Sequence, residues 1–178
     1  MDKSIAVVIL NYNTRHHLEA FLPDVVRFCP NAEVIVADNG SPDDSVPWLR
    51  EHFPEVRLIE LTENKGFCAG YNEALRQVNA DYYVLLNSDV AVTEGWIDPL
   101  VGYLETHPKV AACQPKILSY HQPTHFEYAG ACGGFLDKLG YPYCRGRLFD
   151  SVEEDQGQYD DDRKIFWASG ACFCVRAK

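Results

Sequence analysis

Short polar clusters directly follow several apolar runs of the sequence, and their residue types could support ligand chemistry. The clusters are Asn11–Asn13, Asp38–Ser41, Asn64–Gly66 and Asn87–Asp89. A hard divalent cation takes oxygen ligands and often combines one or two carboxylates with the phosphates of a substrate. Asp89 could therefore hold a cation against a diphosphate. Asp89 could instead cap the next helix, although Thr93 is a competing cap.

Asp38 and Gly66 could contact a nucleotide, although each also has a purely local interpretation. A carboxylate only accepts hydrogen bonds, so Asp38 could bind the imide N–H of uracil or thymine. The Asn-Gly-Ser sequence after it equally indicates an Asx-turn. Gly66 and Gly70 would let the backbone approach a ligand, and a helix that begins after Gly66 would offer free N–H groups to an anion. Gly66 could also simply form a turn.

Apolar residues along the chain alternate between strand-like runs and helical spacing. The strand-like runs are Ile5–Leu10, Val34–Ala37, Val56–Leu61, Tyr82–Leu86 and Val110–Cys113, and a further apolar segment covers Ile165–Val175. Between the first two runs, helical spacing connects Leu18, Phe21, Leu22, Val25 and Val26. Asn13 or Thr14 could cap this first helix, and Pro23 could disturb its second half.

This alternation predicts an α/β fold: a mostly parallel, Rossmann-like sheet with helices on both faces, followed by a smaller irregular C-terminal part. Ligands of such sheets bind in the crevice at the carboxyl ends of the strands, where the polar clusters lie. The segments that enter the strands are less polar, so the pattern favours a ligand site over ordinary turn chemistry. No G-x-x-x-x-G-K-[ST] loop is present and no G-x-G-x-x-G follows the first strand, which disfavours a dinucleotide or a P-loop nucleotide.

The composition is that of one globular domain. The chain has 178 residues, of which 47% are hydrophobic and 24% charged, and its net charge of −10 argues against a nucleic-acid partner.

The seven cysteines form no C-x-x-C pair and the histidines fit no zinc pattern, so we expect reduced, mostly buried thiols in a cytoplasmic protein. The apolar run at the N-terminus is too short to span a membrane, and any membrane contact would be peripheral, at the inner face. The acidic groups Glu153–Asp155 and Asp160–Asp162 are expected to lie in a solvated loop.

Five segments, read in order, resemble the family 2 glycosyltransferases of the GT-A fold, in the rhamnosyltransferase-like branch. The segments are VVILNYN, VADNGSPDDS, ENKGFCAGYNEAL, LLNSD and WASGACFCVR. Each motif is short, but their order and spacing from Ile5 to Arg176 are specific for the family. They are not specific for the sugar.

The resemblance implies a role for each matching residue. Asp38, with Asn39 beside it, would face the nucleobase, and Asn11 and Asn13 would line the base and ribose pocket. Asp89 would bind Mg²⁺ or Mn²⁺ between the donor phosphates, in a D-x-D motif whose first position is Asn here. Further nucleotide-sugar contacts fall on Asn64, Gly66, Asn72 and Asn87, and on Gly170, Ala171 and Arg176 at the donor-sugar and acceptor side.

The resemblance also implies where the general base should lie. In the family an acidic motif follows the G-A-x-x-x-x-R segment by a short interval, whereas this chain ends at Lys178 before such a motif. We therefore expect the base after Lys178. The chain is expected to be a single GT-A-like domain, 1–178, truncated at its C-terminal end, with a nucleotide-binding half at 1–118 and the start of an acceptor-side half at 119–178.

The function implied is metal-dependent, inverting transfer of a sugar from a UDP- or dTDP-linked donor to a saccharide or lipid-linked acceptor, as in polysaccharide biosynthesis. An alternative is a module that binds a nucleotide sugar without turnover, which a comparison of turnover with binding would distinguish. A nucleotidyltransferase is a second alternative, although Asn11–Asn13 lacks the glycine-rich, basic loop usual in that class. An α/β domain without a site is the remaining alternative.

Overall fold

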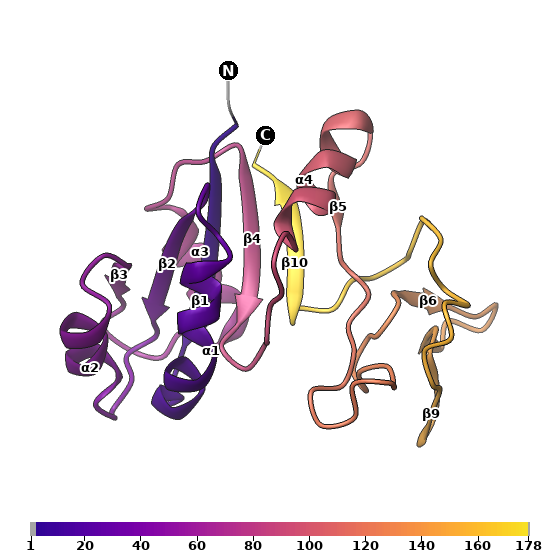
Figure 1. Cartoon of the computed structure of the whole chain (residues 1–178), viewed down its shortest axis with the longest axis horizontal. Coiled ribbons are helices and arrows are strands. Elements are labelled where there is room, and N and C mark those ends of the chain that lie inside the picture. Colours follow the sequence, from indigo (N-terminus) through magenta and orange to yellow (C-terminus); the bar gives the residue numbers. More distant parts are fainter. Residues whose placement is uncertain (1–2, 178) are drawn as a thin grey trace.

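The computed structural model describes residues 3–177 and contains a six-stranded and a four-stranded sheet (Figure 1). The first part of the chain forms β1 (Ile5–Asn11), α1 (Arg15–Arg27), β2 (Glu33–Asp38), α2 (Ser45–His52), β3 (Arg57–Glu60), α3 (Phe67–Leu75), β4 (Tyr82–Asn87), α4 (Ile97–Thr106) and β5 (Ala112–Cys113). The second part forms β6 (Gly134–Leu136), β7 (Pro142–Cys144), β8 (Arg147–Leu148), β9 (Ser151–Val152) and β10 (Cys172–Arg176).

The main sheet has the strand order β3-β2-β1-β4-β10-β5. Strands β1 to β4 are parallel, whereas β10 runs antiparallel to both β4 and β5. The predicted mostly parallel α/β sheet is therefore confirmed. The strand expected at Val110–Cys113 is shortened to a two-residue edge strand, and β10 separates it from β4.

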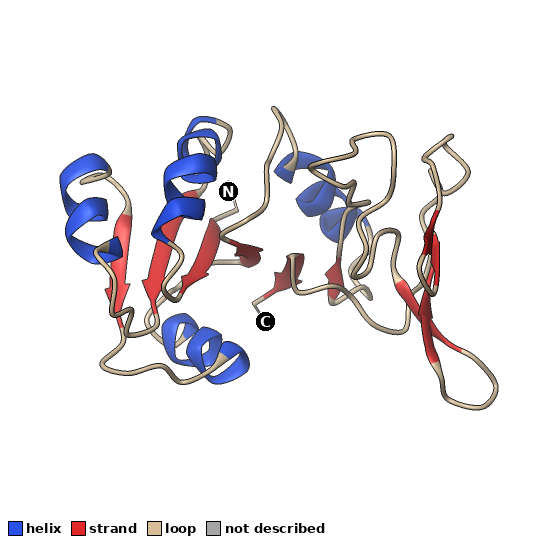
Figure 2. Ribbon diagram, turned by 90° about the horizontal axis from the view of Figure 1, so that it is seen from below, coloured by secondary structure: helices blue, strands red, loops and turns tan. Residues whose placement is uncertain are grey.

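Both faces of the sheet are covered by helices, because successive side chains of a strand point to opposite faces (Figure 2). Val7 and Ile9 of β1 pack in one core cluster with residues of α1, α2 and α4. Ala6 and Val8 pack in the other cluster, with residues of α3. Burial on both faces explains why β1 reads as a continuous apolar run rather than an alternating one.

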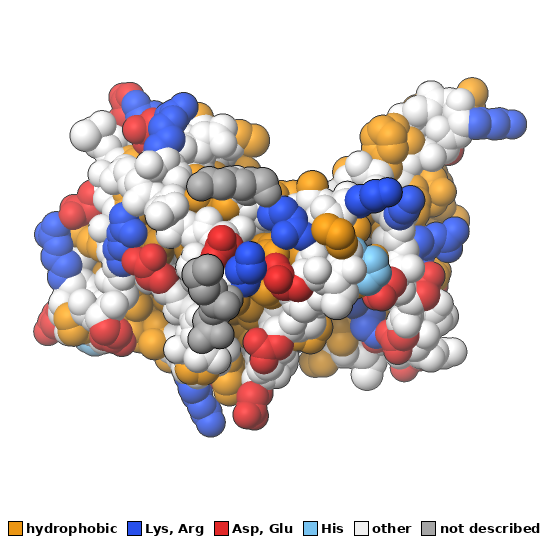
Figure 3. Space-filling view, turned by 90° about the horizontal axis from the view of Figure 1, so that it is seen from above, with side chains coloured by type: hydrophobic (Ala, Val, Ile, Leu, Met, Phe, Trp, Pro, Cys, Tyr) orange, Lys and Arg blue, Asp and Glu red, His pale blue; other side chains and the backbone are white. Residues whose placement is uncertain are grey.

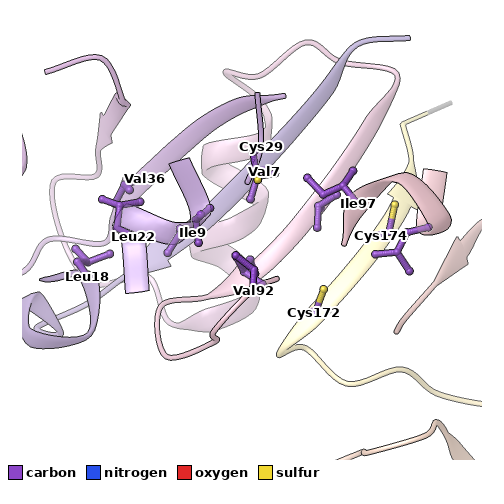
Figure 4. Packing of buried hydrophobic residues seen from close by; sticks show 14 of the residues in the cluster. Val7, Ile9, Leu18, Leu22, Cys29, Val36, Val92, Ile97, Cys172 and Cys174 are labelled. Carbon is purple, nitrogen blue, oxygen red and sulfur yellow. The ribbon is translucent and has the colours of Figure 1, made fainter. Parts of the chain in front are cut away.

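Helix α1 packs through the apolar spacing that predicted it. Its buried residues are Leu18, Leu22 and Val25, and the first two lie against Ile9 and Val36 of the sheet (Figure 4). Burial of each such side chain contributes about 1.5–3 kcal/mol. Pro23 does not interrupt the helix, which continues to Arg27.

The four-stranded sheet β6-β7-β8-β9 is antiparallel and projects from the body of the molecule, with hydrophobic side chains exposed along it (Figure 3). Ion pairs tie the acidic segment to this part of the chain: Lys116 Nζ lies 2.6 Å from Asp155 and 2.5 Å from Asp160, and Arg145 pairs with Asp161. Asp160 and Asp161 are nevertheless exposed in a loop, as expected, whereas the Asp155 side chain is mostly covered.

The thiols agree with the expectation of reduced cysteines. All seven are free, and five of them are buried, with Cys68 exposed and Cys113 partly buried. Burial raises the pKa of Cys29 to about 11 and that of Cys172 to about 12.

Within residues 3–177, no helix is long and apolar enough to cross a membrane.

Candidate nucleotide-sugar site

A cleft of about 370 Å³ lies at the carboxyl ends of the parallel strands. Its lining consists of Leu10, Tyr12, Thr14, His17, Asn39, Asn64, Gly66, Phe67, Asn87, Ser88 and Asp89. The chain runs from β1 to its neighbour β2 on one side, while β4 lies on the other side of β1. The loops after β1 and β4 therefore diverge, which opens a crevice at this point of the sheet.

A buried hydrogen-bond network joins the loops after β1 and β2. The Asn11 side chain, 0% exposed, donates from Nδ2 to Asp38 Oδ1 at 2.8 Å and to Ser41 Oγ at 3.0 Å. Asp38 Oδ2 accepts from the Ser41 backbone N–H at 2.9 Å, which is the Asx-turn contact expected of that sequence. Asp38 is only 3% exposed, so the carboxylate lies behind the cleft lining and is engaged with protein donors.

The Asn39 side chain holds the loop that carries Gly66 through hydrogen bonds. Its Nδ2 donates to Asn64 Oδ1 at 3.0 Å and to the Gly66 carbonyl at 3.2 Å, and its Oδ1 accepts from the Lys65 backbone N–H at 3.0 Å. Asn64 Oδ1 also accepts from the Gly66 backbone N–H at 2.8 Å. Asn39 is thus both a wall of the cleft and the residue that fixes the loop before α3.

The same two loops approach each other closely at a glycine. Gly40 has φ of +72°, and a Cβ there would lie 2.8 Å from backbone atoms of Glu63. Only glycine combines this conformation with this contact. A Cβ at Gly70 would also be crowded, because it would lie 3.0 Å from Asn39 Nδ2. Helix α3 therefore packs directly against the Asn39 side chain.

The Asp89 carboxylate is open to solvent at the cleft. It lines the cleft and is exposed, and no described residue forms a hydrogen bond or ion pair with its side chain. The helix that follows begins at Ile97, after Trp96, so neither Asp89 nor Thr93 is its N-cap residue. Nowhere in residues 3–177 do three or more His, Cys, Asp or Glu side chains form a metal cluster. A lone carboxylate fits a cation whose other ligands are phosphates.

The C-terminal segment reaches the end of β4. The Asn87 backbone N–H donates to the Ala171 carbonyl at 2.9 Å. A Cβ at Gly170 would lie 3.1 Å from the Phe67 ring, which is 52% exposed on the cleft. Gly170 and Ala171 therefore lie next to the cleft.

Arg176 lies at the opposite end of the sheet. It pairs in register with Tyr82, the first residue of β4, and donates to the Tyr82 hydroxyl at 2.7 Å and to the Leu104 carbonyl at 2.5 Å. Arg176 therefore lies away from the cleft, and its position does not suit the donor-sugar role that the motif match suggested.

The predicted site residues divide by position. Those in the cleft lining are Asn39, Asn64, Gly66, Asn87 and Asp89. Those beside or behind it are Asn11, Asn13, Asp38, Gly170 and Ala171, whereas Asn72 is exposed on α3 and does not line the cleft. Sequence reasoning assigned no ligand-binding role to the lining residues Tyr12, Thr14, His17 and Phe67. Their position in the sequence could have indicated them, because Tyr12, Thr14 and His17 lie within the first turns of chain after β1 and Phe67 begins α3.

Solved structures with a similar fold include a mannosyltransferase. A mannosyltransferase from Pyrobaculum calidifontis, solved in complex with GDP-Man and Mn²⁺, matches 63% of this chain and 35% of its own, with 25% identity and a TM-score of 0.56. TarS of S. aureus matches 59% of this chain and 33% of its own, with 18% identity and a TM-score of 0.52, a likeness of fold alone. The sheet and its cleft therefore define a glycosyltransferase domain of the GT-A fold.

The chain belongs to glycosyl transferase family 2, whose sequence model matches residues 6–159. An N-acetylglucosaminyl-diphospho-decaprenol L-rhamnosyltransferase of Mycobacterium tuberculosis is 26% identical over 195 residues, which cover 99% of this chain and 62% of that protein. The uncharacterized glycosyltransferase YwdF of Bacillus subtilis is 25% identical, over 92% of this chain and 64% of its own length. The family resemblance read from the motifs is confirmed, and the chain spans less than two thirds of these relatives.

Proposed function

We propose that this chain binds the donor in a glycosyltransferase that moves a sugar from a nucleoside-diphosphate sugar to a hydroxyl group. The observation that carries the proposal is the exposed Asp89 carboxylate, which has no partner among the described residues and lies in a cleft at the strand ends of a family 2 domain. Family membership favours an enzyme over a module that only binds a nucleotide sugar. Measured transfer, compared with measured binding, distinguishes the two.

A divalent cation, Mg²⁺ or Mn²⁺, would be held by Asp89 together with the donor diphosphate. When bound, it supplies positive charge that stabilises the diphosphate as a leaving group. The similar mannosyltransferase was solved with GDP-Man and Mn²⁺, which supports this assignment. Asn39 and Asn64 hold the Gly66 loop at the rim, where its backbone can approach the nucleotide. The nucleobase is proposed to be uracil or thymine, with guanine as the option that the mannosyltransferase suggests.

The acceptor is proposed to be a saccharide or a lipid-linked saccharide, and the mycobacterial relative, named for a decaprenol-linked acceptor, supports this class. Transfer would invert the anomeric carbon, with a carboxylate removing the proton of the attacking hydroxyl. We assign that base to none of the described residues. The expected position beyond Lys178, in an acceptor-side half that begins near residue 119, remains our proposal.

The proposal is tested by thermal unfolding with UDP, dTDP, GDP and CDP, each with Mn²⁺ and with EDTA. A ligand at a hundredfold excess over its Kd stabilises the folded state by about 2.7 kcal/mol. We expect one diphosphate to stabilise the chain, more with Mn²⁺ than with EDTA. Asp89→Asn should remove the Mn²⁺-dependent increment, because it removes the anionic ligand. Asp162→Asn, at an exposed acid outside the cleft, is the matched control.

No stabilisation by any of the four diphosphates would contradict the proposed function. A full Mn²⁺ increment in Asp89→Asn would contradict only the assignment of the metal ligand. Equal stabilisation by UDP and CDP would indicate that Asp38 serves its turn and not an imide N–H of the base, because cytosine lacks that group.

A further inference from the structure

The cleft that would receive a diphosphate contains very little positive charge. Its lining residues include no Lys or Arg, and Asp89 adds a negative charge. Oxyanions are usually held by N–H donors, often charged ones. His17 is the one lining residue whose side chain can carry a positive charge, and a neutral imidazole still has an N–H to donate.

The fold places His17 beside the loop that carries Asp89. His17 follows Thr14 by one helical turn, and its backbone N–H donates to the Thr14 carbonyl at 2.9 Å. The Thr14 and Ser88 hydroxyl oxygens are 3.1 Å apart and share a hydrogen bond, and Ser88 precedes Asp89 directly. The start of α1 is therefore fixed to the end of β4.

The ring of His17 is supported by neighbouring rings but has no hydrogen-bond partner among the described residues. Its centroid lies 4.0 Å from that of His16 and 6.3 Å from that of Phe21, which in turn meets Tyr120 edge-on at 5.2 Å. In the described part of the chain, no residue hydrogen-bonds to the His17 ring nitrogens. The Thr14 hydroxyl is already engaged with Asn11 and Ser88, so it is less available to a ligand.

We propose that the His17 side chain donates a hydrogen bond to the terminal phosphate of the nucleoside diphosphate. This inference rests on the proposed function and deepens it by naming a phosphate-binding residue on α1, across the cleft from the sheet. The imidazole supplies a side-chain N–H donor in a site whose other proposed contacts to the diphosphate are the cation and backbone N–H groups. Its contribution does not require the cation, so it can be measured in EDTA.

The test compares His17→Phe, which keeps a flat ring without an N–H, with His17→Gln, which keeps an N–H donor. His16→Phe is the matched control, because His16 is the neighbouring, exposed histidine and does not line the cleft. Kd values would be measured by calorimetry in EDTA, for the UDP–UMP, dTDP–dTMP and GDP–GMP pairs. The pair whose diphosphate binds the unmodified chain best is used for the variants.

We expect His17→Phe to weaken diphosphate binding about tenfold and monophosphate binding less than twofold, because a hydrogen bond to a charged group is lost. His17→Gln should recover part of the loss, and His16→Phe should bind as the unmodified chain does. Unchanged diphosphate binding by His17→Phe would overturn the proposal. Equal weakening of the monophosphate and the diphosphate would overturn it too, because the ring would then act on the shape of the cleft. Diphosphate binding that is measurable with Mn²⁺ but not in EDTA would overturn this inference alone, because His17 would then hold no phosphate without the cation. If no diphosphate binds the unmodified chain even with Mn²⁺, the proposed function itself fails, and this inference with it.

Discussion

Asp38 and Asp89 show how burial separates two aspartates that look alike in sequence. Each follows an apolar strand, and each was a candidate ligand-binding carboxylate. Asp38 lies behind the cleft with both oxygens accepting protein hydrogen bonds, whereas Asp89 is exposed in the cleft without a partner among the described residues. The residue types could be read from the sequence, but burial could not, because it depends on Asn11 at the end of the neighbouring strand β1 and on Ser41 in the following turn.

Replacement of Asp38 by Asn should therefore lower the stability of the free protein. The new amide would present an N–H₂ group to the Asn11 amide or to the Ser41 N–H, and one of these buried donors would lose its acceptor. The loss of a buried acceptor costs about 1–3 kcal/mol. Urea unfolding without ligand measures the change in the free energy of unfolding.

Asp44→Asn is the control for this prediction, because the exposed Asp44 side chain makes no capping hydrogen bond to α2 and, among the described residues, forms only a surface ion pair with Arg15, at 3.2 Å. Surface pairs contribute about 0–1 kcal/mol. Stability of Asp38→Asn equal to that of the Asp44 variant would show that the network around Asn11 is not structural.

At the scale of elements, most strands and helices could be predicted, because the period of apolar residues reports which side of an element is buried. The errors have physical causes. Pro23 suggested a disturbed helix, but tertiary packing of Leu22 and Val25 maintains α1 through it. The antiparallel pairing of β10 could not be predicted, because register with β4 is set by contacts between residues far apart in sequence. The strands β6 to β9 are two or three residues long, too short to show a period.

The loops after β2 and after β3 approach each other closely at Gly40, and this approach fixes their positions at the cleft. We expect Gly40→Ala to destabilise the chain more than Gly95→Ala. Gly95 has nearly the same φ, +71° against +72°, but nothing lies within 4 Å of a Cβ placed there. Both variants bear the cost of a left-handed residue, about 1–2 kcal/mol. Only Gly40→Ala adds overpacking against the Glu63 backbone, typically about 1–3 kcal/mol.

Thermal and urea unfolding of the two variants would isolate the contact between the loops. Diphosphate binding should also weaken in Gly40→Ala, since the Asn64–Gly66 rim must move. Equal stability of the two variants would mean that the loops can separate at little cost.

At the scale of the whole molecule, ion pairs hold the acidic segment against the rest of the chain. The hydrogen bond from Lys116 holds the pKa of Asp155 below its ordinary value of 3.8, and Asp155 raises the pKa of Lys116 above its ordinary 10.5. A depressed carboxyl pKa stabilises the folded state above the unfolded pKa, and this contribution is lost as the pH falls through the folded value. The raised amine pKa contributes below 10.5 and is lost as the pH rises through its folded value.

Lys116→Met should therefore be less stable than the unmodified chain between about pH 5 and pH 10, and the difference should shrink below about pH 4. Urea unfolding across this range measures it. Lys138→Met removes an exposed lysine from the projecting sheet and serves as the control. A difference that stays constant down to pH 3 would show that the Lys116 effect comes from its apolar stem and not from the pairs.

The position of β10 in the sheet also has a consequence for synthesis on the ribosome. Residues 5–87 contain β1 to β4 in consecutive order, so this part can pair as soon as it is made. The open side of β4 must then wait for residues 172–176, which are translated roughly half a chain later. During that interval a nascent polypeptide carries an unpaired strand edge, which is the kind of surface that invites association between chains. A chaperone that binds exposed strands could bind the open edge of β4 throughout the interval between translation of Asn87 and translation of Cys172.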